Sequence, residues 1–140
     1  MPVTATMASA APLNAFNKVI TALNNSVKVK CALFTSSFSY NQETALYSSL
    51  TNECAATGNY STGGATCTGC TLSEATKVTT FTTANVSWAS STISAQYAVY
   101  YDSDSSVILA TVNFGAVYSS TNGTFQITTN GSGVFTITVA

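Results

Sequence analysis

The sequence contains no histidine and no arginine, and its charged side chains are limited to four lysines and five acids among 140 residues. Many enzymes use histidine as a general acid, a general base or a metal ligand. Serine and threonine are abundant, but without histidine the usual base that activates such nucleophiles is missing. We therefore expect a protein that is not an enzyme and that holds no cofactor.

The shortage of charge also argues against two kinds of partner. The net charge is −1 and the lysines form no cluster, so we expect no nucleic-acid binding. No apolar run approaches the roughly 20 residues of a membrane helix. The N-terminus, MPVTATMASAAPLNAF, lacks the basic and apolar regions of a secretory signal. We expect a chain made in a cytoplasm, with no membrane partner.

Hydrophobic residues make up 46% of the chain, so a folded protein is expected rather than a disordered one. A chain of this length fits one domain. Its surface must be covered mainly by Ser, Thr, Asn and Gln, and a surface without net charge promotes association. This composition suits a protein that packs against neighbours, although a secreted or surface domain would have a similar one.

The four cysteines leave three alternatives open. Cys67 and Cys70 have the spacing of half a zinc knuckle, but Cys31 and Cys54 lie too far apart to supply the other half. A disulfide is the second alternative. Cys31 occupies an inward position of an alternating strand, where a thiol behaves as a small apolar group. We favour buried thiols and predict no metal site.

The N-terminal part of the chain divides into an arm and a helix. Residues 1–11 show no periodicity and are interpreted as a flexible or extended arm, followed by a single domain at 12–140. Pro12 stands at a preferred helix start. Apolar residues then recur at three- and four-residue steps, which predicts a helix over 12–24: Leu13, Phe16, Ile20 and Leu23.

From Val27 onward the apolar period changes to two. This alternation predicts strands near 27–34, 65–72, 77–83, 93–101, 107–114, 124–129 and 134–139. Asn130-Gly131-Ser132-Gly133 predicts a hairpin between the last two strands. One strand is expected to place five residues on one face: Ile93, Ala95, Tyr97, Val99 and Tyr101.

The segments between these strands are predicted as loops and turns. Residues 35–44 and 56–64 are loops, 45–53 holds a turn of helix, and 102–106 forms a tight turn. The fold class is therefore mainly β, an antiparallel β-sandwich or partly closed barrel with one N-terminal α-helix.

The carboxylates are candidates for chemistry: Glu43, Glu53, Glu74, Asp102 and Asp104. A glycosidase needs two of them across one bond, but nothing in the spacing pairs Glu43 with Glu53, and both fall in loops. Asp102 and Asp104 could ligate calcium, but a polar hairpin tip is the favoured interpretation. Lys28 and Lys30 are expected on the outward face of a strand, so neither is predicted to act as a base.

Aromatic residues could form either an interface or a core. Tyr40, Tyr47 and Tyr60 lie in predicted loops, where tyrosine is common at protein interfaces. For Tyr97 and Tyr101, which lie with Tyr100 on one strand, we favour the core. Trp88 is predicted to anchor the core rather than to form a ligand platform.

Four stretches contain motifs that resemble those of a known family in the same order. They are VKVKCALFTSSFSYNQET, SSLTNECAATGNYSTGGATC, ANVSWASSTISAQYAVYYDSD and VILATVNFGAVYSSTNGTFQITTNGSGVFTITVA. The chain resembles a family of small structural proteins of tailed bacteriophages, with matches at 33–37, 50–53, 58–64, 86–99 and 114–139. It departs from that pattern at Cys31, Cys54 and Cys67, where aliphatic residues are expected.

The resemblance implies a virion component without enzymatic activity. One placement is a capsid cement, or decoration, protein that binds the major capsid protein on the outside of the shell, as a homotrimer at local threefold positions. Another is a tail, neck or host-contact protein of the same virion. A secreted carbohydrate-binding β-sandwich, which needs an exposed Trp or Tyr platform, is a third hypothesis. An enzyme would require Glu43 and Glu53 to meet in a cleft.

Overall fold

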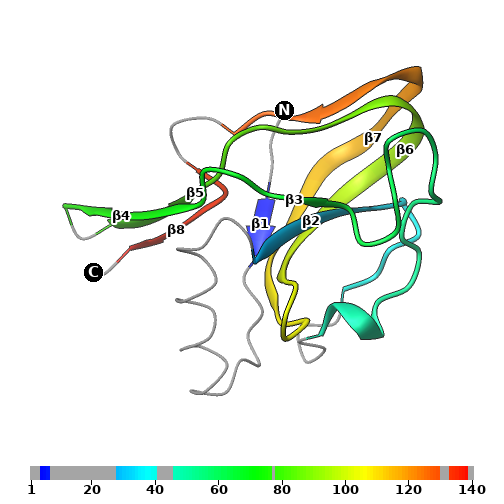
Figure 1. Ribbon diagram of the computed structural model, residues 1–140. Coiled ribbons are helices and arrows are strands. Elements are labelled where there is room, and N and C mark those ends of the chain that lie inside the picture. The colour runs from blue at the N-terminus through cyan, green and yellow to red at the C-terminus, as the bar shows by residue number, and fades with distance from the viewer. Residues whose placement is uncertain (1–3, 7–27, 41–45, 77, 130–132, 139–140) are drawn as a thin grey trace.

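The computed structural model describes residues 4–6, 28–40, 46–76, 78–129 and 133–138. Five strands form one antiparallel sheet in the order β1-β7-β6-β2-β3 (Figure 1). Their bounds are β1 Thr4–Thr6, β2 Val29–Phe34, β3 Ala65–Thr66, β6 Val86–Asp102 and β7 Ile108–Ile127. The prediction of a mainly β protein with antiparallel strands is confirmed.

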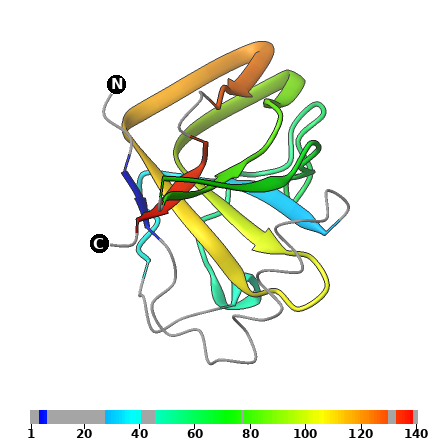
Figure 2. The same cartoon turned by 90° about the vertical axis from the view of Figure 1, so that its left-hand side faces the viewer.

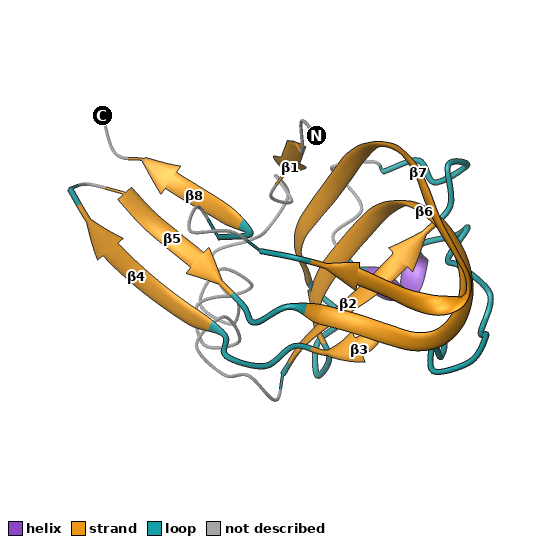
Figure 3. Ribbon diagram, turned by 90° about the horizontal axis from the view of Figure 1, so that it is seen from above, coloured by secondary structure: helices purple, strands orange, loops and turns teal. Residues whose placement is uncertain are grey.

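A smaller antiparallel sheet has the order β4-β5-β8. Its strands are β4 Thr71–Ala75, β5 Val78–Thr82 and β8 Phe135–Thr138. Viewed from above, it projects to one side of the larger sheet (Figure 3). Within the described ranges the helical content is one 3₁₀ turn, η1 Tyr47–Ser49, which confirms the helical turn expected in 45–53. No helix in these ranges is long and apolar enough to cross a bilayer.

Several predicted strand boundaries need correction. The expected strand at 65–72 is two strands, β3 and β4, which belong to different sheets. The expected strand at 107–114 is the first part of β7, which continues to Ile127. The predicted helix at 12–24 and most of the arm at 1–11 lie outside the described residues. Thr4–Thr6 of that arm is a strand, β1, which pairs with β7 at Thr111–Asn113.

The predicted C-terminal hairpin is wrong. The segment expected at 124–129 pairs with β6, where Val86 faces Ile127, while β8 pairs with β5. Gly133 explains the glycine signal, because its φ is +70° and an added Cβ would lie 2.2 Å from the Phe81 carbonyl oxygen. The backbone N–H of Val134 donates to that same oxygen. The glycine therefore allows close approach to β5 rather than a two-residue turn.

β6 and β7 form one long hairpin whose tip is the predicted turn after Asp102. The Asp102 carboxylate accepts a hydrogen bond from the backbone N–H of Ser105, 3.1 Å away, and another from the Ser105 hydroxyl. At the same tip Lys28 forms an ion pair with Asp104. These contacts confirm a polar hairpin tip.

The hairpin is interrupted by a large irregularity. Tyr97 faces Asn113, but Ala95 faces Tyr118, so Gln96 alone lies opposite four residues of β7, Phe114–Val117. A bulge of this kind bends a strand and increases its twist. In Figure 2 the first part of β7 (yellow) and its second part (orange) accordingly run in different directions.

The same irregularity overturns the single face expected for the strand at 93–101. Ile93 and Ala95 lie in one apolar cluster, whereas Val99 and Tyr101 lie in the other, with Tyr97 packed against it. The register shift between Ala95 and Tyr97 moves the later residues to the opposite face.

β2 lies between these two apolar clusters. Val29, Cys31 and Leu33 point into the larger cluster, and Ala32 and Phe34 into the smaller one. All five are fully buried. A strand covered on both faces carries a continuous apolar run instead of strict alternation, as VKCALF does from Cys31 onward.

β7 is paired unevenly along its outer edge. β1 covers that edge at three residue pairs, Thr111–Asn113. Past Asn113, none of the described strands pairs with this outer edge, although β6 still pairs with the inner edge of β7. Residues 115–119 of this stretch are exposed.

Candidate functional site: a neutral aromatic cavity

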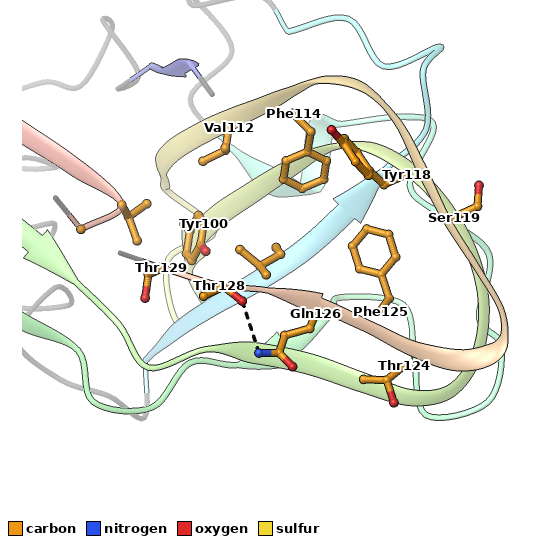
Figure 4. Close-up of a pocket in the computed structure, with 13 residues that line it drawn as sticks. Tyr100, Val112, Phe114, Tyr118, Ser119, Thr124, Phe125, Gln126, Thr128 and Thr129 are labelled. Atoms are coloured by element: carbon orange, nitrogen blue, oxygen red, sulfur yellow. Dashed lines mark hydrogen bonds between the residues drawn. The ribbon is translucent and has the colours of Figure 1, made fainter. Parts of the chain in front are cut away.

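A cavity of about 460 Å³ lies where β7 bends (Figure 4). Both halves of β7 contribute to it, together with Tyr100 of β6 and the residues before β8. Its lining is Tyr100, Val112, Phe114, Tyr118, Ser119, Thr124, Phe125, Gln126, Ile127, Thr128, Thr129, Gly133 and Val134. The volume falls within the range of small-molecule sites, about 300–1,000 Å³.

Aromatic rings form one wall of the cavity. The ring centroids of Phe114 and Phe125 are 6.4 Å apart, and Tyr118 meets Phe114 edge-on at 6.3 Å. Trp88 supports Phe125 from behind at 6.3 Å, and Tyr60 in turn packs on Trp88 at 5.5 Å. Because the bulge lies between Asn113 and Tyr118, it brings Phe114 and Tyr118 to the same wall.

Neutral polar groups complete the lining. They are the hydroxyls of Ser119, Thr124, Thr128 and Thr129 and the amide of Gln126. The Gln126 amide donates to the Thr128 hydroxyl at 3.3 Å (Figure 4), and the Thr129 hydroxyl donates to the Thr83 carbonyl at 2.7 Å. None of the lining residues carries a charge. The cavity can therefore hold a neutral molecule but supplies no ionisable acid–base pair.

The absence of charge extends over the surrounding surface. Residues 78–101 and 105–140 contain no Asp, Glu, Lys or Arg. The exposed positions of β6 are instead small and neutral, as at Ser87, Thr92 and Ser94. Ser94 and Ser119 join the two strands through a 2.8 Å hydroxyl–hydroxyl bond. Val117 and Tyr118 add exposed apolar area beside the cavity, 50% and 42% exposed.

Glu53 has a structural position that the sequence did not reveal. Its Oε1 accepts hydrogen bonds from the Tyr60 hydroxyl at 2.8 Å and from the Gly63 N–H at 2.7 Å. Its Oε2 accepts one from the Tyr47 hydroxyl. Tyr47 in turn stacks on Tyr101 at 4.0 Å. Burial and the Glu53 carboxylate raise the pKa of Tyr47 and Tyr60.

Among the carboxylates whose contacts the structure describes, Asp102 and Asp104 bond to partners other than Glu53. Glu43 lies outside the described residues, so its expected separation from Glu53 stays a prediction. At the hairpin tip, Asp102 accepts a hydrogen bond from Ser105 and Asp104 forms an ion pair with Lys28. Hydrogen bonding to Asp104 raises the pKa of Lys28, which keeps this ammonium charged. Lys30 of β2 is half-buried.

The cysteines are core residues. Cys31, Cys54 and Cys67 are free thiols that lie buried in the larger cluster, and Cys70 is buried there too. Burial raises the pKa of Cys31 to about 12 and that of Cys54 to about 11. No group of three metal-ligating side chains occurs among the residues described. The preferred interpretation, buried thiols, is confirmed for these three cysteines.

The core prediction for the aromatics holds at several positions. Trp88 is 2% exposed, and Tyr100 and Tyr101 are buried. The Tyr101 hydroxyl donates to the Gly63 carbonyl at 2.7 Å. Tyr60 is also buried although it lies in a loop, and its hydroxyl accepts a hydrogen bond from the Leu33 N–H at 2.9 Å.

Sequence reasoning did not find the cavity. Most of its residues fall in two separate predicted strands, one ending at 114 and the other starting at 124. Gly115 within this apolar run is the sequence signal for an irregular bend.

No family model matches this chain, and no curated protein or solved structure matches it either. The resemblance to phage structural proteins therefore stays a prediction from sequence motifs.

Proposed function

We propose that the protein is a non-enzymatic structural component of a bacteriophage virion, and specifically a capsid cement protein. In this proposal it binds the outer surface of the major capsid protein shell. The single observation that carries the proposal is the charge-free surface of the β6–β7 hairpin away from its tip, because residues 86–101 and 108–127 contain no Asp, Glu, Lys or Arg. Its exposed positions are neutral, and the cores of protein interfaces are depleted of charged residues.

The physical task of such a protein is to bind the assembled shell and not its separated subunits. A ligand with that preference stabilises the assembled state by mass action, and many copies multiply the effect. No catalytic group is required for this task. The neutral surface serves it because a neutral contact exacts a smaller desolvation cost than a charged one.

We further propose a homotrimer at local threefold positions of the shell. β1 supports exchange between copies, because three residue pairs hold it at a sheet edge. The chain between β1 and β2, residues 7–28, is long enough to let β1 reach a neighbour. In this proposal the segment 12–24 is a helix, and it completes a sandwich or partly closed barrel with the two sheets.

The alternative placement is a tail, neck or host-contact protein of the same virion. Stoichiometry separates the two placements. Hundreds of copies in an imaged particle support the shell, while a ring of six or twelve would contradict the cement proposal.

A reconstitution experiment tests the contact surface. Purified protein is added to undecorated shells and its occupancy is measured by imaging. Ser87→Glu puts a charge on the neutral β6 surface and should lower occupancy at least tenfold, whereas Ser36→Glu in an exposed loop should not. Equal occupancy of the two variants would contradict docking through β6 and β7.

A further inference from the structure

We propose that the cavity at the bend of β7 binds a neutral saccharide. This inference concerns a second site and does not rest on the cement role. It follows from three properties of the lining: an aromatic wall, a set of neutral hydrogen-bonding groups and the absence of charge.

The aromatic wall suits the apolar faces of a sugar ring. A pyranose ring has apolar C–H faces that pack on aromatic rings, and such rings bury large apolar areas with defined geometry. Tyr118 is 42% exposed, so part of its ring is accessible for such packing. Phe114, buried behind it, holds the ring edge-on at 6.3 Å.

The polar lining suits the hydroxyl groups of a sugar. Sugar hydroxyls both donate and accept, and so do serine, threonine and glutamine side chains. Ser119, Thr124 and Gln126 lie along the same stretch of β7 as Tyr118 and Phe125 (Figure 4). A few neutral polar groups around an apolar wall are the common composition of a ligand site.

Other ligand classes fit less well. A phosphate or carboxylate would enter the cavity without a counter-charge, at a high desolvation cost. A purely apolar ligand would keep water from the remaining donors and acceptors of Gln126, Thr124 and Thr128, which costs about 1–3 kcal/mol for each group left unsatisfied. A molecule with apolar faces and neutral hydroxyls avoids both costs.

The cavity is also organised before binding. The Gln126–Thr128 bond fixes one side, and Thr129 is held by the Thr83 carbonyl and by the Asn85 side chain, which accepts from its N–H at 3.2 Å. Phe114 and Phe125 are 6% and 7% exposed, so they lose little freedom on binding. A preformed site of this kind lowers the ordering cost of binding.

Titration with a panel of sugars tests the proposal. The full chain is titrated with neutral methyl glycosides and short neutral oligosaccharides, and with sialylated and sulfated ones for comparison. Trp88 is the only tryptophan and supports Phe125 from behind, so its fluorescence reports on the cavity wall. We expect saturable binding of at least one neutral sugar and none of the charged ones.

Matched variants locate the binding. Tyr118→Ala should weaken the affinity about tenfold, whereas Tyr118→Phe should keep most of it because the ring remains. Val117→Ala is the control, because Val117 is at least as exposed as Tyr118 but does not line the cavity. Circular dichroism checks that each variant is folded.

Three outcomes would overturn the proposal: no neutral sugar binds at millimolar concentration, charged sugars bind equally well, or Tyr118→Ala and Val117→Ala behave alike. Shell occupancy of Tyr118→Ala is measured in parallel. A loss of sugar binding with unchanged occupancy supports a second site, and a failure of sugar binding leaves the occupancy test of the cement role unaffected.

Discussion

Glu53 connects three segments of the chain through one carboxylate. It accepts hydrogen bonds from Tyr47 in η1, from Tyr60 in the following loop and from the backbone of Gly63. Tyr101 of β6 joins the same group of residues, because its hydroxyl donates a hydrogen bond to the Gly63 carbonyl. Glu53 therefore links η1 and the following loop, and Tyr101 links this group to the sheet. None of the described carboxylates lies in hydrogen-bond contact with Glu53.

We predict that Glu53→Ala destabilises the protein by about 2–4 kcal/mol, because three donors lose their acceptor in a partly buried place. Denaturant unfolding measures this change. Ser48→Ala, at an exposed position of η1, is the control and should shift the free energy by less than about 0.5 kcal/mol. Equal stabilities of the two variants would show that solvent replaces the Glu53 contacts.

The buried thiols and phenols predict a loss of stability at alkaline pH. Burial raises the pKa of Cys31 from 9.0 to about 12 and that of Tyr101 from 10.0 to about 12. The unfolded chain therefore releases these protons at lower pH than the folded protein does. Their contribution to stability is complete below pH 9 and is lost between pH 9 and 12.

Unfolding curves recorded from pH 7 to 12 check this prediction. Tyr101→Phe should be less stable at pH 7, because the bond to Gly63 is lost, but its stability should fall less steeply above pH 10. A flat pH profile up to 12 would contradict the shifted pKa values.

At the scale of elements, local patterns predicted the strands well but not their partners. The patterns in 27–34 and 77–83 predicted β2 and β5, which bury Val29, Cys31 and Leu33 in one case and Phe81 in the other. The bulge after Asn113 depends on how two long strands meet across the sheet, which no local pattern records. The local pattern of β8 likewise does not reveal its partner, because β5 lies far away in the sequence.

The candidate site was less predictable than the fold for the same reason. Its wall combines Phe114 and Phe125, which lie on two halves of one bent strand, with Trp88 from another. The sequence identified Trp88 as a core anchor but contained no signal for the side on which Tyr118 would lie.

The loop that carries Gly64 depends on contact with β2. An added Cβ at Gly64 would lie 1.8 Å from the Cys31 carbonyl oxygen, and its φ is +73°. We predict that Gly64→Ala costs about 2–4 kcal/mol, measured as a lower midpoint of thermal unfolding. Gly123→Ala, where the nearest atom is 3.6 Å away, should change stability by less than about 1 kcal/mol. Similar midpoints for both variants would contradict this close packing.

At the scale of the whole molecule, long parts of the chain carry no charge, namely 78–101 and 105–140. The described charged residues include Lys28 and Asp104, which pair at the hairpin tip, and Glu53 beneath the loops. The long β6–β7 hairpin beyond that tip is neutral. If this surface makes the contact with a shell, binding should depend little on ionic strength.

We therefore predict that occupancy of shells changes less than about twofold between 50 and 500 mM salt, because screening acts on charged contacts. Sedimentation of decorated shells measures it. A steep decline with salt would indicate that lysines and acids make the contact instead.

Deletion of residues 2–11 tests the N-terminal arm. This deletion removes β1 and uncovers the edge of β7 at Thr111–Asn113. We expect weaker decoration and a smaller oligomer, with the domain still folded because β1 contributes three residue pairs. Equal decoration by truncated and full-length protein would exclude a role for the arm.

The outer edge of β7 past Asn113 has a consequence for the purified protein. Sheet edges in natural proteins are commonly guarded by lysines, prolines or covering loops, and this stretch contains no lysine or proline. None of the described strands pairs with the outer edge of β7 here, so its backbone amides and carbonyls can pair with another copy of the chain. Because a net charge of −1 gives little repulsion between copies, we expect the protein to associate edge to edge at high concentration.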